Sequence, residues 1–139
     1  MKTITLNYRG YWIEATKGSI PKKSGVYCVY AGTYNHAKGN VSLRELIYVG
    51  ESEDVRTRLA NHERQEDWEK LLRAGETLCY SMAEVVSDDR VRAEAAVIHR
   101  HKPPCNREYV NRFPFATTTI KTSGRNYLLK TEFTVFTKR

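Results

Sequence analysis

The sequence predicts an α/β (α+β) fold in which helices flank a small, mainly antiparallel sheet, and three observations lead to this class. Strand-like and helix-like runs alternate along the 139 residues. A β-branched and aromatic run at residues 25–34 and a second strand-like run at 43–50 have the spacing of a long-looped hairpin. No repeat, low-complexity tract or linker divides the chain. We therefore expect one domain, 1–139, with a core at 22–108 and a basic C-terminal β-hairpin extension at 112–139.

The first half of the chain is expected to be mostly strands. Residues 10–15 (GYWIEA) form a short strand, and residues 17–25 form a basic loop rich in turn formers. Residues 25–34 follow as a β-branched and aromatic strand. A polar connection at 35–42 then leads to the returning strand at 43–50.

A helix is expected next, from an N-cap at Ser52 to about Arg64, with two acids in its first turn. Its apolar stripe contains Val55 and Leu59. Arg58 and His62 are four residues apart, about one helical turn, so they should lie on one face at the edge of that stripe.

The second half should add two helices, one strand and a hairpin. Residues 66–75 form a helix that buries Trp68, and residues 77–86 form a strand. A helix at 89–102, capped by Ser87 or Asp88, must end before a proline. Two strand-like runs around Ser123-Gly124-Arg125, 115–122 and 126–136, indicate the C-terminal hairpin.

Composition is that of an ordinary soluble protein, with 40% hydrophobic and 28% charged residues. No apolar run approaches the roughly 20 residues that cross a membrane, and no signal peptide is evident, so a cytoplasmic location is the default. Three cysteines cannot all pair within one chain, and we expect reduced thiols.

Positive charge is concentrated near the C-terminus. The net charge is +7, and residues 107–139 hold seven cations against two acids. A basic end of this kind suits a polyanion such as nucleic acid, although a solubilising surface would have the same composition.

Glu94 stands out in the helix at 89–102. It lies beside an apolar stripe at spacing i, i+4, i+7, formed by Val91, Ala95 and Ile98. An ionised carboxylate on a packing face is costly unless it is paired or binds a cation. Glu94 is therefore expected either to hold a divalent metal or to reach solvent, Arg90 or Arg58.

Two strand tyrosines complete a set of reactive groups. Tyr27 and Tyr48 should lie at one level of the hairpin, although tyrosine also fills strands routinely. A phenol, an arginine, a histidine and a lone carboxylate can together position water, bind a phosphate oxygen, move a proton and hold a hard metal. Phosphodiester hydrolysis requires these roles.

At these residues the sequence resembles the GIY-YIG nucleases. The runs GVY (25–27) and YVG (48–50) are similar to the paired triplets of that family. GESEDVRTRLANH resembles its arginine helix followed by a histidine, and RAEAAVIHRHKPPCN resembles its metal-binding glutamate helix with the loop that ends in asparagine. The resemblance spans 25–106, in the family's order.

The resemblance implies a Mg²⁺- or Mn²⁺-dependent DNA endonuclease. Its catalytic residues would be Tyr27, Tyr48, Arg58, His62, Glu94 and Asn106. Arg58 would bind the scissile phosphate, Glu94 the metal, and Asn106 would fix the active-site loop. Valines replace the family's isoleucines. Glu51 is a larger departure, since many members have a basic or amide residue there; it would pair with Arg58 or face away.

Other functions remain open on the sequence alone. The scaffold could bind nucleic acid without cutting, or the C-terminal aromatics could bind RNA. His99, His101 and Cys105 are close in sequence but match no standard zinc spacing. DNA specificity would come from loops, from a homodimer or from the basic residues Lys121, Arg125 and Lys130. A small restriction or defence nuclease is our first expectation, and a structure-specific repair or recombination nuclease is the second.

Overall fold

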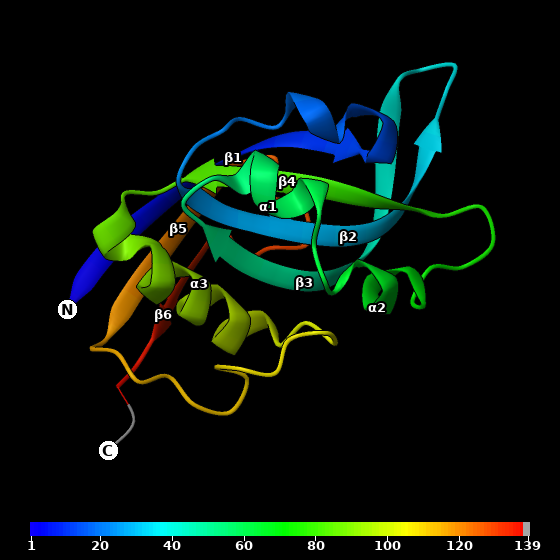
Figure 1. Cartoon of the computed structure of the whole chain (residues 1–139). Coiled ribbons are helices and arrows are strands. Elements are labelled where there is room, and N and C mark those ends of the chain that lie inside the picture. Colours follow the sequence, from blue (N-terminus) through cyan, green and yellow to red (C-terminus); the bar gives the residue numbers. More distant parts are fainter. Residues whose placement is uncertain (138–139) are drawn as a thin grey trace.

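Residues 1–137 are described by a computed structural model, and within them six strands form one sheet in the order β3-β2-β4-β1-β5-β6 (Figure 1). The strands are β1 (Lys2–Ile13), β2 (Gly25–Asn35), β3 (Asn40–Ser52), β4 (Thr77–Glu84), β5 (Thr118–Gly124) and β6 (Glu132–Val135). The helices are η1 (Glu14–Ser19, 3-10), α1 (Val55–Ala60), α2 (Gln65–Glu69) and α3 (Ser87–His101). The predicted α+β class is confirmed. Within residues 1–137 the pair β1–β5 is parallel and the other strand pairs are antiparallel, so the sheet is mainly antiparallel.

Helices cover both faces of the sheet, and the buried side chains of β2 alternate between these two faces. Its even-numbered residues, such as Val26 and Cys28, pack in a core cluster with α3. Its odd-numbered residues, such as Tyr27 and Val29, pack in a second cluster with α1 and with Trp68 of α2. Successive strand residues point to opposite faces, so one fully buried strand supplies both cores. Figure 1 shows α1 over β2 and β4, with α3 near β5 and β6.

The first strand is longer than expected. The prediction of a strand at 10–15 missed residues 2–9, and Glu14–Ser19 is 3-10 helix. Residues 4–8 alternate between buried and exposed positions, as a half-covered strand requires. Their partner β5 lies more than a hundred residues away in the chain, and local sequence gives no sign of such a pairing.

The helix expected at 52–64 is much shorter. Ser52 ends β3, and the N-cap is Asp54, whose carboxylate accepts a hydrogen bond from the backbone N of Thr57. Asn61 leaves the helical conformation (φ −147°, ψ 74°). His62 therefore lies in the segment after α1, and the prediction that Arg58 and His62 share one helical face is wrong.

The remaining elements agree with prediction in type and differ in extent. The helix expected at 66–75 covers only Gln65–Glu69, although Trp68 is fully buried as expected. Helix α3 begins at Ser87 with no side-chain cap, so neither Ser87 nor Asp88 serves as its N-cap. The C-terminal hairpin is confirmed as β5–β6, but a connection at 125–131 replaces a tight turn, and β5 joins the main sheet through β1.

Candidate active site

Tyr27 lies at the centre of the site, where the paired triplets meet. In the β2–β3 hairpin Tyr27 is opposite Gly50, and Val29 is opposite Tyr48. The Tyr27 ring lies over Gly50 so closely that a Cβ at position 50 would be 2.3 Å from its Cζ and Oη atoms. A glycine is therefore required at this point of the second triplet.

The Tyr27 hydroxyl contacts His62 inside the protein. The Tyr27 Oη and His62 Nε2 atoms are 2.9 Å apart, and both residues are buried. His62 Nδ1 accepts a hydrogen bond from the backbone N of Arg64 at 3.0 Å. A neutral imidazole that accepts at Nδ1 carries its hydrogen on Nε2. His62 thus donates to the Tyr27 oxygen and leaves the phenol's own hydrogen for another partner.

Burial sets the protonation of this pair. It lowers the pKa of His62 to about 4, and the nearby positive charge of Arg58 acts in the same direction. Burial also raises the pKa of Tyr27, and the neighbouring Tyr48 adds to the rise while Arg58 opposes it. Near neutral pH the substrate-free site therefore contains a neutral imidazole and a neutral phenol.

The low pKa of His62 predicts a pH-dependent stability. Between its ordinary value near 6.5 and about 4, the unfolded chain binds a proton that the native site does not. Stability is therefore expected to fall as pH decreases through this window, by up to about 3 kcal/mol. Urea denaturation of wild type and His62→Gln from pH 7 to pH 4 measures it. The variant should lose less stability, whereas His36→Gln, at an exposed position, should behave like wild type.

Tyr48 joins Tyr27 and His62 in an aromatic cluster that also includes Trp68. The Tyr48 ring centroid lies 6.3 Å from that of Tyr27, 5.6 Å from that of His62 and 5.1 Å from that of Trp68. The Arg64 guanidinium is 5.7 Å from the Tyr48 ring centroid. Sequence reasoning missed Arg64 and the contribution of Trp68 to the site, because neither belongs to the motifs.

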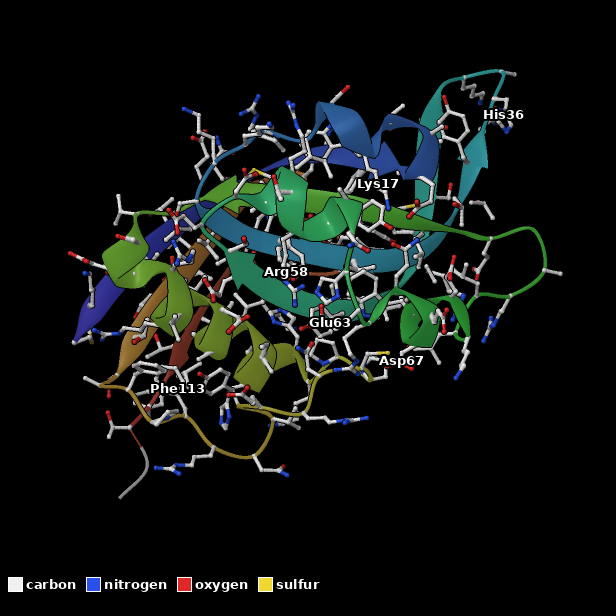
Figure 2. All side chains as sticks on the ribbon, viewed as in Figure 1. Lys17, His36, Arg58, Glu63, Asp67 and Phe113 are labelled. Carbon is white, nitrogen blue, oxygen red and sulfur yellow. The ribbon has the colours of Figure 1, made fainter. Side chains whose placement is uncertain are left out.

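Arg58 projects from α1 and is held by Glu63. Its NH1 and NH2 groups donate to the two carboxylate oxygens of Glu63 at 2.5 and 2.7 Å, and the two side chains lie side by side in Figure 2. Glu51 does not pair with Arg58 as one alternative expected; it forms an ion pair with Arg90 of α3. A planar fork that binds a carboxylate in this bidentate way can bind a phosphate in the same geometry.

The pairing with Glu63 predicts that this carboxylate competes with an incoming phosphate. Glu63→Gln is expected to raise DNA affinity several-fold, because a neutral amide holds a guanidinium less strongly than a carboxylate does. Binding by fluorescence anisotropy measures the effect, and Glu66→Gln, an exposed position nearby, is the charge-matched control. Equal affinities for the two variants would show that Glu63 does not occlude Arg58.

Glu94 is half-buried on α3 and forms no ion pair among the residues that the structure describes. Burial raises its pKa to about 8, and the carboxylates of Glu51 and Glu108 act in the same direction. The expected stripe is only partly right, because Val91 is 39% exposed while Ala95 and Ile98 are buried.

Glu94 lines a hollow of about 270 Å³ together with Tyr48, Arg64, Ile98, Asn106, Arg107, Glu108 and Tyr109. A divalent cation here would compensate the carboxylate whose ionisation burial disfavours. Within the described residues no three His, Cys, Asp or Glu side chains cluster as a metal cage. The donor set therefore fits Mg²⁺, which typically uses one or two carboxylates and takes its other ligands from water and substrate phosphate.

Asn106 secures the loop after α3 to the edge strand β3. Its Nδ2 donates to the carbonyl oxygen of Val49, and its Oδ1 accepts from the backbone N of Val49, both at 2.9 Å. The backbone N of Cys105 also donates to the carbonyl oxygen of Ile47 at 3.0 Å. The loop thus pairs with the edge of β3 at Ile47 and Val49 and borders the hollow at Glu94.

The basic C-terminal residues lie away from this cluster. Lys121, Arg125 and Lys130 are exposed on or near β5 and β6, at the sheet edge opposite β3. Lys121 has only a long contact of 4.0 Å to Glu132. The structure thus brings the tyrosines, His62 and Arg58 together, with Glu94 and Asn106 beside Tyr48. None of these three cations lines the hollow at Arg58 or the hollow at Glu94.

Two of the open alternatives find little support. His99 and His101 each use Nδ1 in a hydrogen bond with a backbone carbonyl, of Tyr109 and Val97 respectively, and no three-ligand zinc cluster forms among the described residues. Of the C-terminal aromatics, Phe113 is buried and Tyr109 and Phe115 pack against the core. Tyr127, which is 63% exposed, remains as a stacking surface.

The chain is similar to UvrABC system protein C of Haloarcula marismortui, with 30% identity over 99 residues. The match covers 68% of this chain but 15% of that protein, so the chain spans a small part of the length of its relative. No protein-family profile matches the chain, and no solved structure matches it. No helix within residues 1–137 is long and apolar enough to cross a membrane.

Proposed function

We propose that this chain is a divalent-metal-dependent DNA endonuclease of the GIY-YIG type, which hydrolyses phosphodiester bonds. The observation that carries the proposal is the Tyr27–His62 hydrogen bond beside Tyr48, at the point where the paired triplets meet in the hairpin. A strand filled with tyrosine for packing alone does not require a buried histidine aimed at its hydroxyl.

The side chains of the site support distinct roles. Arg58 is suited to hold a non-bridging oxygen of the scissile phosphate, once its fork exchanges Glu63 for the substrate. His62 is suited to position Tyr27 rather than to accept a proton, because both ring nitrogens already have partners. Tyr27 and Tyr48 can orient the attacking water through their hydroxyl groups. Either one can receive the water's proton only as a phenolate, after its own proton has left to solvent, and positive charge from Arg58 or from a bound metal would favour that ionised form.

Glu94 is the residue that would hold the metal, with Mg²⁺ or Mn²⁺ supplying positive charge for the phosphate and the departing 3′ oxygen. Asn106 keeps the neighbouring loop fixed on β3, so that the hollow at Glu94 retains its shape. Glu51 is neutralised by Arg90, which limits the repulsion that an acid near the phosphate would cause.

The similarity to UvrABC system protein C supports the same class, because the family that the chain resembles includes nucleases of DNA repair. It also favours a structure-specific repair or recombination nuclease over the restriction or defence nuclease that we first expected. A cytoplasmic location, a homodimer and the DNA specificity remain predictions.

The test is cleavage of end-labelled DNA by the purified chain with Mg²⁺, on duplex, single-stranded and branched substrates. We expect strand cleavage by wild type and a strong loss in Tyr27→Phe, which keeps the ring that packs on Gly50. Binding to all three substrates without cleavage of any would replace the proposal by a non-cutting nucleic-acid-binding module. A preference for branched DNA would support the repair assignment.

A further inference from the structure

A bulge in β1 brings Arg9 and Trp12 to the same face of the sheet. The pairing of β1 with β4 is regular to Gly10, opposite Ser81, and then shifts so that Trp12 is opposite Tyr80. Two residues three positions apart would point to opposite faces of a regular strand. The bulge removes this alternation, and bulges often redirect a side chain towards a site.

Arg9 and Trp12 border an open groove whose other wall includes Arg125. The groove has a volume of about 560 Å³ and is lined by Tyr8, Arg9, Gly10, Trp12, Gly124 and Arg125. Gly10 and Gly124 have positive φ angles of 144° and 75°, and a Cβ at either would collide with a backbone carbonyl oxygen at 2.8 or 2.2 Å. The groove therefore keeps two glycines where a larger residue could not fit.

Both arginines of the groove are available to a ligand. Arg9 is exposed, and its contact with Glu84 is 3.6 Å between two side chains that are each more than half exposed, which is worth little in water. Arg125 is exposed and has no ion pair among the residues that the structure describes. Two exposed guanidinium groups beside an indole match a phosphate-linked aromatic base.

The sheet register connects this groove to the candidate active site. Tyr27 is opposite Met82, and Met82 is opposite Arg9, so the three side chains point to one face. Two strand spacings separate Tyr27 from Arg9, about 10 Å. That distance corresponds to roughly three steps of 3.4 Å along a DNA strand.

Lys22 is a further exposed cation near the candidate active site. It lines a hollow together with Arg58, and the acids Glu53 and Asp54 line the same hollow. Three residues further on, Gly25 pairs with Glu84, whose carboxylate contacts Arg9.

We propose that this groove binds the DNA strand that flanks the scissile phosphate, with phosphates on Arg9 and Arg125 and a base against Trp12. The inference rests on the proposed nuclease function and adds a second contact region to it. It assigns a role to Arg9 and Trp12, which no motif of the sequence indicates.

Tryptophan fluorescence tests the groove directly, because the chain has two tryptophans and Trp68 is fully buried. The experiment uses Glu94→Gln protein, so that the DNA stays uncut, and titrates it with a short single strand or duplex. We expect DNA to quench the emission, and Trp12→Phe to remove most of the quenching while the far-UV circular dichroism is unchanged. Quenching that persists in Trp12→Phe would come from Trp68 and would overturn the stacking contact.

A salt titration tests the two arginines. In the same background, Arg9→Ala and Arg125→Ala should each reduce the slope of log K against log salt by about 0.9 on duplex DNA. Arg73→Ala and Arg100→Ala, which remove the same charge from exposed positions elsewhere, should leave the slope unchanged. If the groove variants show the same salt slope as the control variants, the proposal is overturned.

The two proposals fail in different ways. If the chain cuts no DNA but the groove variants still weaken binding, the nuclease function fails and the groove remains a DNA contact. If the chain cuts DNA but the groove variants bind like the controls, the nuclease function stands and the groove proposal fails.

Discussion

Arg58→Ala is expected to slow DNA cleavage by on the order of 10²-fold to 10³-fold, the loss seen when one donor to a developing negative charge is removed. The effect should fall mainly on the chemical step, because the guanidinium fork is suited to charge that builds up on a phosphate oxygen. Arg58→Lys should restore little, since an ammonium group cannot make the bidentate contact that Arg58 makes with Glu63.

Single-turnover cleavage under saturating DNA measures this loss. Arg73→Ala removes an equal charge from an exposed position and should cleave like wild type. The stability of Arg58→Ala should change little, because the Glu63 side chain is 66% exposed and is hydrated once its partner is gone. Near-normal cleavage by Arg58→Ala would mean that this pair only shapes the surface of α1.

Glu94→Gln should abolish detectable Mg²⁺-dependent cleavage and should weaken metal binding, while DNA binding persists. Glutamine keeps the size of the side chain and removes the charge that would attract the cation. Titration of Mn²⁺ into wild type and the variant, followed by calorimetry, measures the binding. Glu69→Gln, on the exposed side of α2, is the charge-matched control and should bind Mn²⁺ like wild type.

The same variant has a second readout in metal-free protein. The pKa of Glu94 is raised from 4.5 to about 8, so the native carboxyl keeps a proton that the unfolded chain loses between these values. Wild-type stability should therefore fall relative to Glu94→Gln as pH rises through this window, by up to about 1.4 kcal/mol per pH unit. Parallel curves for the two proteins would show that Glu94 reaches solvent.

The sequence predicted those parts of the site that depend on local pattern. The triplets around Tyr27 and Tyr48 specify two strands, and the antiparallel pairing of neighbouring strands then places the two phenols together. The fold class followed in the same way, because strand and helix runs alternate clearly. Cys28 and Cys79 are free thiols that lie buried in the core.

The parts that failed depend on contacts between distant segments or on loops. The spacing of Arg58 and His62 indicated one helical face, but the helix ends at Ala60, and His62 meets Tyr27 from the following segment. Glu63 holds Arg58 from five residues away, which no helical spacing indicates. The partner of Glu51 could not be read either, because Arg90 approaches it from α3, almost forty residues later.

The extent of α3's buried face was also difficult to predict. Short alanines at 93, 95 and 96 form much of its contact with the sheet, and alanine gives a weak periodic signal because it occurs on both faces of helices. Val91 was therefore assigned to the stripe and is exposed. The bulge at Gly10 was difficult to predict as well, because it depends on the pairing of β1 with β4 and not on a local motif.

We propose that Tyr27, Tyr48, Arg58 and Glu94 form one metal-dependent phosphodiesterase site. The most direct measurement is cleavage of an end-labelled DNA by wild-type protein in excess chelator, followed by addition of Mg²⁺ to the same sample. We expect intact DNA in chelator and strand cleavage once free Mg²⁺ is present. Cleavage that proceeds equally in chelator, or DNA that stays intact at every Mg²⁺ concentration while it remains bound, would contradict it.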